Sequence, residues 1–206
     1  MPSTTFFRLP EEKRSRLVKE AWREFSRAPL SDASINRIIL GARIPRGSFY
    51  QYFVDKNDLF LFLLDKIRDK FLVLFDDAVE QVNGDMFALP EFLFTQLIDE
   101  DGTVTARFAQ GFKLLSLNLN MDIQHLFFAR AESELLPRLL SGRIDTSNLR
   151  SSELKFVGCT FSLLISTLGE AIAQTLMHGA PRDEQLEQLR LRVDIIKNGS
   201  VKGECK

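Results

Sequence analysis

Apolar positions recur every three or four residues along almost the whole chain, and no segment shows the sustained alternation of a half-exposed strand. An early face of this kind comprises Leu17, Val18, Ala21, Trp22 and Phe25. The same spacing runs without a break over about 55–82, until Asn83-Gly84-Asp85 stops it. At about 1.5 Å per residue, that second segment predicts one helix of about 40 Å. The pattern as a whole predicts an all-α protein.

Further apolar faces predict helices at 89–99, 104–119, 122–139, 152–178 and 182–197. A polar loop at 143–150 precedes the last two, and a break at 178–181 separates them. No linker divides the chain, because the long helix begins in one part and ends in the other. We therefore predict an N-terminal domain over 1–55 and a C-terminal helical body over 56–206.

Residues 34–59 predict two short helices joined by a tight turn and followed directly by a third helix. Ser34 is a good N-cap, and isoleucines follow it at helical spacing as far as Ile39. The stretch 41–43 breaks this run. Pro45 then suits the first position of a new helix, since its φ is fixed and it lacks an N–H. This arrangement is typical of a helix-turn-helix.

The second short helix is too small to make a core of its own, and its outward side is polar. That side presents Arg46, Gly47, Ser48, Tyr50, Gln51 and Tyr52. Arg46 and Gln51 can present paired hydrogen-bonding groups to base edges in the major groove of DNA. We expect phosphates to be held by Ser34, Tyr50, Tyr52 and Lys56.

These residues resemble the TetR family of bacterial transcription regulators. The ungapped match comprises Ser34, Ile38, Ala42, Ile44, Pro45, Gly47, Ser48, Phe49, Tyr50, Tyr52, Phe53, Lys56 and Leu59. Arg43 stands where the family usually has Gly, Pro45 replaces Ser, Tyr52 replaces His, and Pro29 replaces a Gly. The resemblance implies a three-helix DNA-binding domain joined by the long helix to a C-terminal domain that binds an effector and dimerises.

The distribution of charge agrees with a DNA-binding N-terminus. Residues 1–56 hold eleven Lys and Arg against six Asp and Glu, while the rest of the chain holds 16 basic and 22 acidic residues. The net charge of −1 therefore conceals a part at +5 and a part at −6. A basic module beside an acidic body favours polyanion binding at one end only.

Cysteine usage and apolar run length bear on location. Cys159 and Cys205 are too few for a disulfide framework, and the N-terminus has no apolar signal core, so we expect a cytoplasmic protein. The longest uncharged run, 156–169, has 14 residues, which is too short to span a bilayer. We expect no membrane partner.

The two C-terminal helices carry patterns suited to helix–helix contact. Small residues recur at Gly158, Ser162, Gly169 and Ala173, and a heptad-like seam comprises Leu186, Leu189, Val193 and Ile196. These helices either complete the core of one chain or form a four-helix interface with a second copy. A helix-turn-helix that reads two half-sites favours the homodimer, and the TetR resemblance implies the same.

The body is rich in phenylalanine: the chain has 18 Phe but two Tyr and one Trp. Most of these rings belong to packing, but rigid aromatics are also what a pocket for a small apolar effector requires. The candidate wall residues are Phe71, Phe75, Phe112 and Phe128. The polar groups that could orient a ligand are Gln110, Asn118, His125, Arg130 and Thr160.

Catalytic and metal-binding patterns are missing from the sequence, which has two histidines, no HExxH and no Cys-x-x-Cys. We therefore expect no catalytic residues, no metal and no cofactor. The prediction is a ligand-responsive homodimeric regulator, most simply a repressor, that binds a palindromic double-stranded DNA operator. The alternative is a helical small-molecule-binding or interaction protein whose helix-turn-helix no longer reads DNA.

Overall fold

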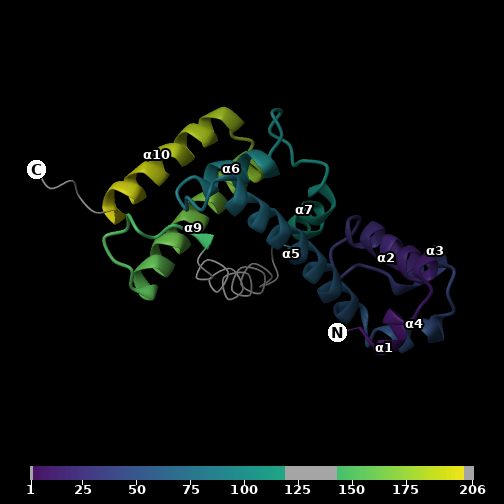
Figure 1. Ribbon diagram of the computed structural model, residues 1–206. Helices are drawn as coiled ribbons and strands as arrows, with labels where there is room; N and C mark the ends of the chain where they lie inside the picture. The colour runs from purple at the N-terminus through teal and green to yellow at the C-terminus, as the bar shows by residue number, and fades with distance from the viewer. Residues whose placement is uncertain (1, 119–142, 202–206) are drawn as a thin grey trace, which may run out of the picture. The chain divides into compact units, whose positions relative to one another are not determined.

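The structure, a computed structural model, describes residues 2–118 and 143–201 (Figure 1). Over those residues it contains helices and two isolated β-bridges, but no strand. The helices are α1 (Thr4–Phe7), α2 (Glu11–Phe25), α3 (Ile35–Ala42), α4 (Arg46–Tyr52), α5 (Lys56–Gln81), α6 (Leu89–Leu97), α7 (Ala109–Ser116), α9 (Leu154–His178) and α10 (Arg182–Ser200). The all-α prediction is confirmed. The helix predicted at 122–139 lies outside the described residues.

The described residues divide into two compact units. Residues up to Lys70, with 106–118, belong to unit 1, and residues 71–105, with 143–201, belong to unit 2. Helix α5 is continuous, and it passes from unit 1 to unit 2 after Lys70. The domain boundary predicted between 55 and 56 coincides with the start of α5, whereas unit 1 extends further and also includes α7.

Unit 1 is built around aromatic rings. Phe25 of α2 lies edge-on to Phe60 of α5, with 5.2 Å between ring centroids. Phe49 of α4 lies 5.9 Å from Phe53, which ends that helix. All four rings are at most 2% exposed. Because Phe49 anchors α4 from its inner side, the opposite side of α4 is left for solvent.

Helix α7 joins unit 1 at two points. Gly111 allows a close approach to α5, since a Cβ there would lie 3.1 Å from the Ile67 side chain. Asn118, directly after α7, accepts a hydrogen bond from the Leu30 N–H and donates one to the Leu114 carbonyl, both at 2.8 Å. Asn118 is 3% exposed, so it serves as a satisfied core residue and not as the ligand-orienting group considered from the sequence.

In unit 2, α6 packs against α9 and α10, and α10 runs alongside α9 (Figure 1). Phe75 of α5 lies edge-on to Phe161 of α9 at 5.9 Å. Arg192 of α10 forms an ion pair of 2.7 Å with Glu170 of α9. The two C-terminal helices are therefore a packed pair within one chain.

Three local features differ from the sequence-based expectations. Helix α7 begins at Ala109 instead of 104, because the chain turns back after α6: the Asp99 N–H donates to the Thr103 carbonyl at 2.8 Å, and Gly102 has φ +79°. Pro45 is the N-cap of α4 and not its first helical residue. Helix α1 was not predicted, since four residues are too few to show a helical period.

By length and composition, α9 could cross a membrane: an 18-residue window has mean hydropathy 1.6. The helix extends well beyond the 14-residue uncharged run, so the expectation of no membrane partner stays a prediction. Apolar helices in the cores of soluble proteins pass the same test. However, 33% of this window is buried within the chain, and Leu163 and Met177 are about half exposed.

Candidate DNA-binding site

The first helix of the predicted helix-turn-helix is capped at both ends. At its start, the Ser34 hydroxyl accepts the Arg37 N–H at 3.5 Å, as the sequence predicts. At its end, Arg43 adopts the left-handed conformation, with φ +54° and ψ +49°, and its N–H reaches the carbonyls of Ile39 and Leu40. Arg43 thus takes the backbone geometry for which glycine is best suited, and its Cβ makes this geometry sterically strained.

Helix α4 presents the predicted polar surface. Arg46, Gly47, Tyr50 and Gln51 are exposed, and Ser48 and Tyr52 are half-buried. A Cβ added to Gly47 would meet no atom of the described residues within 4 Å, so none of them crowds the helix backbone there. The side of α4 that faces away from Phe49 is therefore accessible along its length.

The structure adds Asn36 of α3 to this surface. Its side-chain oxygen accepts a hydrogen bond from Arg46 Nη1. Arg46 Nη2 donates to the Tyr50 hydroxyl at 3.3 Å, and the guanidinium lies 5.7 Å from the centre of the Tyr50 ring. The sequence analysis missed Asn36, and the only signal for it was an exposed amide in the first turn of α3. Arg46 is held between the two helices, in a position to reach a partner outside.

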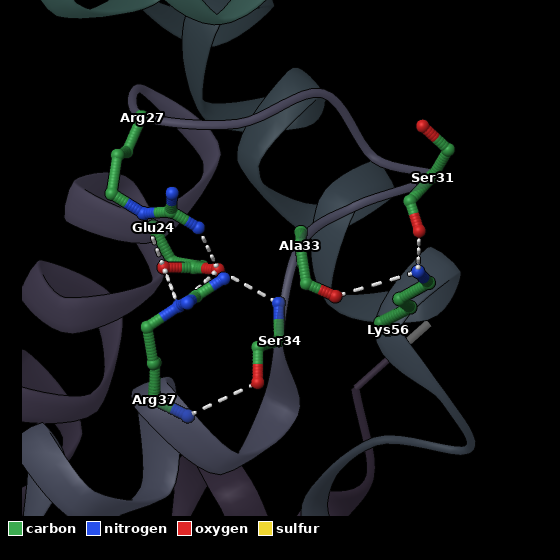
Figure 2. Close-up of polar contacts among 7 residues, drawn as sticks. All are labelled: Glu24, Arg27, Ser31, Ala33, Ser34, Arg37 and Lys56. Atoms are coloured by element: carbon green, nitrogen blue, oxygen red, sulfur yellow. Dashed lines mark hydrogen bonds and ion pairs between the residues drawn. The ribbon is translucent and has the colours of Figure 1, made fainter.

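Lys56, the first residue of α5, holds the loop in front of α3 (Figure 2). Its ammonium donates to the Ser31 carbonyl at 2.7 Å and to the Ala33 carbonyl at 3.4 Å. An ammonium has three donors, so these two carbonyls leave one for a phosphate. The sequence predicted a phosphate contact for Lys56, and the structure adds this loop-holding role.

Beside it, the buried carboxylate of Glu24 ties α2 to the start of α3 (Figure 2). It accepts hydrogen bonds from the Ser34 N–H at 2.7 Å, from Arg37 Nε at 3.0 Å and from Arg27 Nη2 at 2.9 Å. Burial alone would raise the pKa of Glu24, but the hydrogen bonds from Arg27, Ser34 and Arg37 outweigh it and lower that pKa from 4.5 to about 2. Glu24 is therefore ionised at neutral pH and fixes the N-terminus of α3.

Residues 17–63 match the family described as bacterial regulatory proteins, tetR family. The match covers α3, α4 and the start of α5, with most of α2. The N-terminal part of the chain, over these residues, therefore belongs to the TetR family.

Among known proteins, the chain is similar to the transcriptional regulator AcuR of Cereibacter sphaeroides, with 31% identity over 85 residues. That alignment covers 41% of this chain and 38% of AcuR, so the chain spans well under half of the length of this relative.

Solved structures of transcriptional regulators share the fold over nearly the whole chain. One from Mesorhizobium loti has a TM-score of 0.60 at 16% identity and covers 94% of this chain and 100% of its own. A transcriptional regulator from Cytophaga hutchinsonii has a TM-score of 0.60 at 15% identity, covering 93% and 100%. A TetR-family regulator from Streptomyces coelicolor has 0.52 at 16%, covering 96% and 99%. The TetR-like fold therefore extends past the helix-turn-helix.

The predicted pocket residues differ in their surroundings. Phe75 is 1% exposed and packs on Phe161, so it belongs to the core of unit 2. Phe71 and Phe112 are half-buried, and Gln110 is exposed. His125 and Phe128 lie outside the described residues. The wall that the sequence assigned to 122–139 therefore stays a prediction.

The residues predicted for the dimer interface also differ from one another in solvent exposure. Leu186 and Leu189 are 8% and 1% exposed, so they pack within the chain, and their part of the predicted seam faces inward. The other members, Gly158, Ser162, Gly169, Ala173, Val193 and Ile196, are half-buried. The sequence analysis did not select the large apolar residues of this helix pair that are exposed, which are Leu154, Leu163, Met177, Leu191 and Ile195.

Within the described ranges, no group of three or more His, Cys, Asp or Glu side chains could hold a metal ion. The TetR family is a class of transcriptional regulators.

Proposed function

We propose that this TetR-family protein is a ligand-responsive repressor that binds a palindromic operator as a homodimer. The observation that carries the proposal is the exposed side of α4, where Arg46, Tyr50 and Gln51 project from a helix anchored by buried Phe49. A cation, an amide and a phenol on a short helix suit base edges and phosphates in the major groove. The alternative, a helix-turn-helix that no longer reads DNA, would not require these three side chains to be accessible.

Arg46 and Gln51 are the proposed base contacts, and Asn36 joins them because it shares a hydrogen bond with Arg46. Tyr50, Tyr52, Ser34 and Lys56 are the proposed phosphate contacts. In a dimer, two such surfaces would meet half-sites about one helical turn, roughly 34–36 Å, apart.

The direct test is a gel shift with DNA upstream of the protein's own gene, supplemented by selection from a random duplex pool. We expect the selected sequences to be two-fold symmetric. Arg46→Ala should lower affinity for the selected site by about 10-fold or more, because a good bidentate base contact contributes about 1–3 kcal/mol. Arg23→Ala is the matched control, since Arg23 is an exposed cation on α2. Equal affinities for the wild type and Arg46→Ala would refute the assignment of Arg46.

Substitution of Lys56 distinguishes a contact with DNA phosphate from a role confined to holding the loop in front of α3. If it contacts a phosphate, Lys56→Ala should weaken binding to all sequences and lower the salt slope by about one. If it holds only the loop, thermal stability should fall while the salt slope stays unchanged. We expect the slope to change.

Support for the dimer comes from the C-terminal helices. Leu163 and Met177 of α9 are about half exposed within one chain. Elsewhere on α9, a Cβ added at Gly169 would meet no described atom within 4 Å, which would allow a second helix to approach closely. A second copy of this helix pair would bury such positions, and two-fold symmetry would match a palindromic operator.

For the effector, we propose a small, largely apolar molecule bound in the body beside α5. Helix α5 carries the proposal, since it holds Lys56 at one end and Phe71 and Phe75 further along one continuous helix. An effector controls DNA only through different affinities for two states, and a coupling of about 1–3 kcal/mol changes operator affinity about 5- to 150-fold.

A panel of apolar and aromatic compounds, screened by thermal shift and then by operator release, tests this. Compounds that raise the melting temperature but leave operator affinity unchanged would contradict effector control. A cytoplasmic location without a membrane partner is part of the same proposal, and cell fractionation would check it.

A further inference from the structure

Helix α1 is hydrogen-bonded to the end of α4, the proposed recognition helix. The Ser3 N–H donates to the Tyr52 carbonyl at 2.9 Å, and the Ser3 hydroxyl donates to the Gln51 carbonyl at 2.6 Å. The same hydroxyl oxygen accepts the Phe6 N–H at 3.3 Å and so caps α1. Ser3 thus contacts a helix that begins more than forty residues later in the sequence.

These hydrogen bonds satisfy backbone carbonyls that have no partner within α4 itself. The last carbonyls of a helix have no partner within it, and α4 stops when Phe53 takes an extended conformation, with φ −133° and ψ 140°. The two carbonyls that Ser3 reaches belong to the last two residues of α4. At seven residues, α4 is also far too short to be stable alone, so its position depends on what holds it.

Phe6 provides the apolar half of the attachment. It is 0% exposed, and its ring lies 6.5 Å from Tyr52, 4.9 Å from Phe53 and 5.3 Å from Phe62 of α5. One side chain therefore contacts the end of α4 and the first half of α5 at the same time. The angle and depth of α4 relative to α5 are set partly by this ring.

We propose that Ser3 and Phe6 are positioning residues for DNA reading, and that α1 is a clamp that fixes the recognition helix. The inference rests on the proposed function. Base contacts need a reading helix held within a fraction of an ångström, whereas phosphate contacts through flexible side chains tolerate small shifts. Loosening the clamp should therefore cost affinity for the operator more than affinity for random DNA.

The test compares Ser3→Ala with Thr5→Ala, a matched loss of a hydroxyl at an exposed position of α1. Both are assayed on the site that the wild type selects and on random duplex. Ser3→Ala loses both bonds of the hydroxyl, so we expect an operator affinity about three- to tenfold lower. We expect less than a twofold change on random DNA and none for Thr5→Ala. An equal loss on both DNAs, or no loss, would overturn the proposal.

Phe6→Leu and Phe6→Ala extend the test, with Leu retaining part of the selectivity that Ala loses. Amide hydrogen exchange in the free protein gives a readout that does not depend on DNA. Ser3→Ala should speed exchange at residues 49–53 and leave α2 unchanged, and unchanged exchange at 49–53 would reject the clamp. If exchange speeds but the wild type selects no DNA sequence, the proposed function fails and the clamp holds only as a structural attachment, so the positioning role is rejected.

Discussion

At the scale of single residues, Glu24 shows how one buried carboxylate can organise a DNA-binding surface. It joins α2 to the first turn of α3 through Ser34 and Arg37, and it is 4% exposed. Its pKa is lowered to about 2, so the folded chain stabilises the ionised carboxylate more than the unfolded chain does. The stability that it contributes is complete above its ordinary pKa of 4.5 and is lost as the pH falls through about 2.

We therefore predict a pH-dependent effect of Glu24→Gln. At pH 7 it should lower the free energy of unfolding by about 2–3 kcal/mol, since a shift of this size corresponds to up to about 3 kcal/mol. The gap to the wild type should narrow by about 1 kcal/mol at pH 3.5, as measured by urea unfolding. Glu12→Gln is the control, because Glu12 is 88% exposed in its pair with Arg16. A gap that is constant with pH would contradict the ionised Glu24.

Arg43 gives a second residue-scale prediction, because it holds a positive φ without being glycine. Relief of left-handed strain, about 1–2 kcal/mol, is partly offset by the greater freedom of glycine in the unfolded chain. Arg43→Gly should therefore raise the free energy of unfolding by about 0.5–1 kcal/mol in urea. Arg43→Ala keeps the strain and should give no such gain. Equal stabilities for the two variants would mean that the backbone strain is not the cause.

At the scale of elements, α7 is coupled to the loop between α2 and α3 through Asn118. The side chain of Asn118 satisfies the buried N–H of Leu30, which lies 88 residues earlier in the sequence. This bond connects the end of α7 to the segment that leads into α3. A change at this point should therefore be transmitted to the helix-turn-helix.

Asn118→Ala tests that coupling. It leaves the Leu30 N–H buried without its acceptor, and a buried unsatisfied group costs about 1–3 kcal/mol. We expect a loss of about 2 kcal/mol in urea unfolding, together with faster hydrogen exchange at residues 28–33. Asn57→Ala, at an exposed asparagine in the first turn of α5, should change stability by less than about 0.5 kcal/mol. Retention of wild-type stability in Asn118→Ala would show that the loop is held by other contacts.

At the scale of the whole molecule, the proposed dimer can be separated from the fold of one chain. A Cβ added at Gly169 would meet no atom of the described residues within 4 Å, so we expect Gly169→Leu to fold, and glycine replacement within a helix favours folding further. If α9 meets its copy there, the variant should be monomeric by sedimentation and should lose operator binding. Gly199→Leu is the control, since Gly199 also has open space but lies beyond the seam in α10. A dimeric Gly169→Leu that binds DNA normally would place the interface elsewhere.

The helices and the helix-turn-helix were predictable because their signals are local. Ser34 caps the helix that follows it, apolar residues recur at helical spacing, and the matched motif lies within 26 consecutive residues. None of these signals needs a distant partner. The polar side of α4 was predictable for the same reason, since a seven-residue helix with one buried anchor leaves its other positions exposed or half-buried.

What only the tertiary structure decided concerns pairs far apart in the sequence. Periodicity shows that α10 has an apolar face, but not what covers it, and Leu186 and Leu189 turned out to pack within their own chain. The sequence also does not show which arginines a buried glutamate will bind. Likewise, Ser3 could be assigned to the end of α4 only once folding had placed them together, 48 residues apart. Such partners are chosen by packing, which a one-dimensional pattern does not contain.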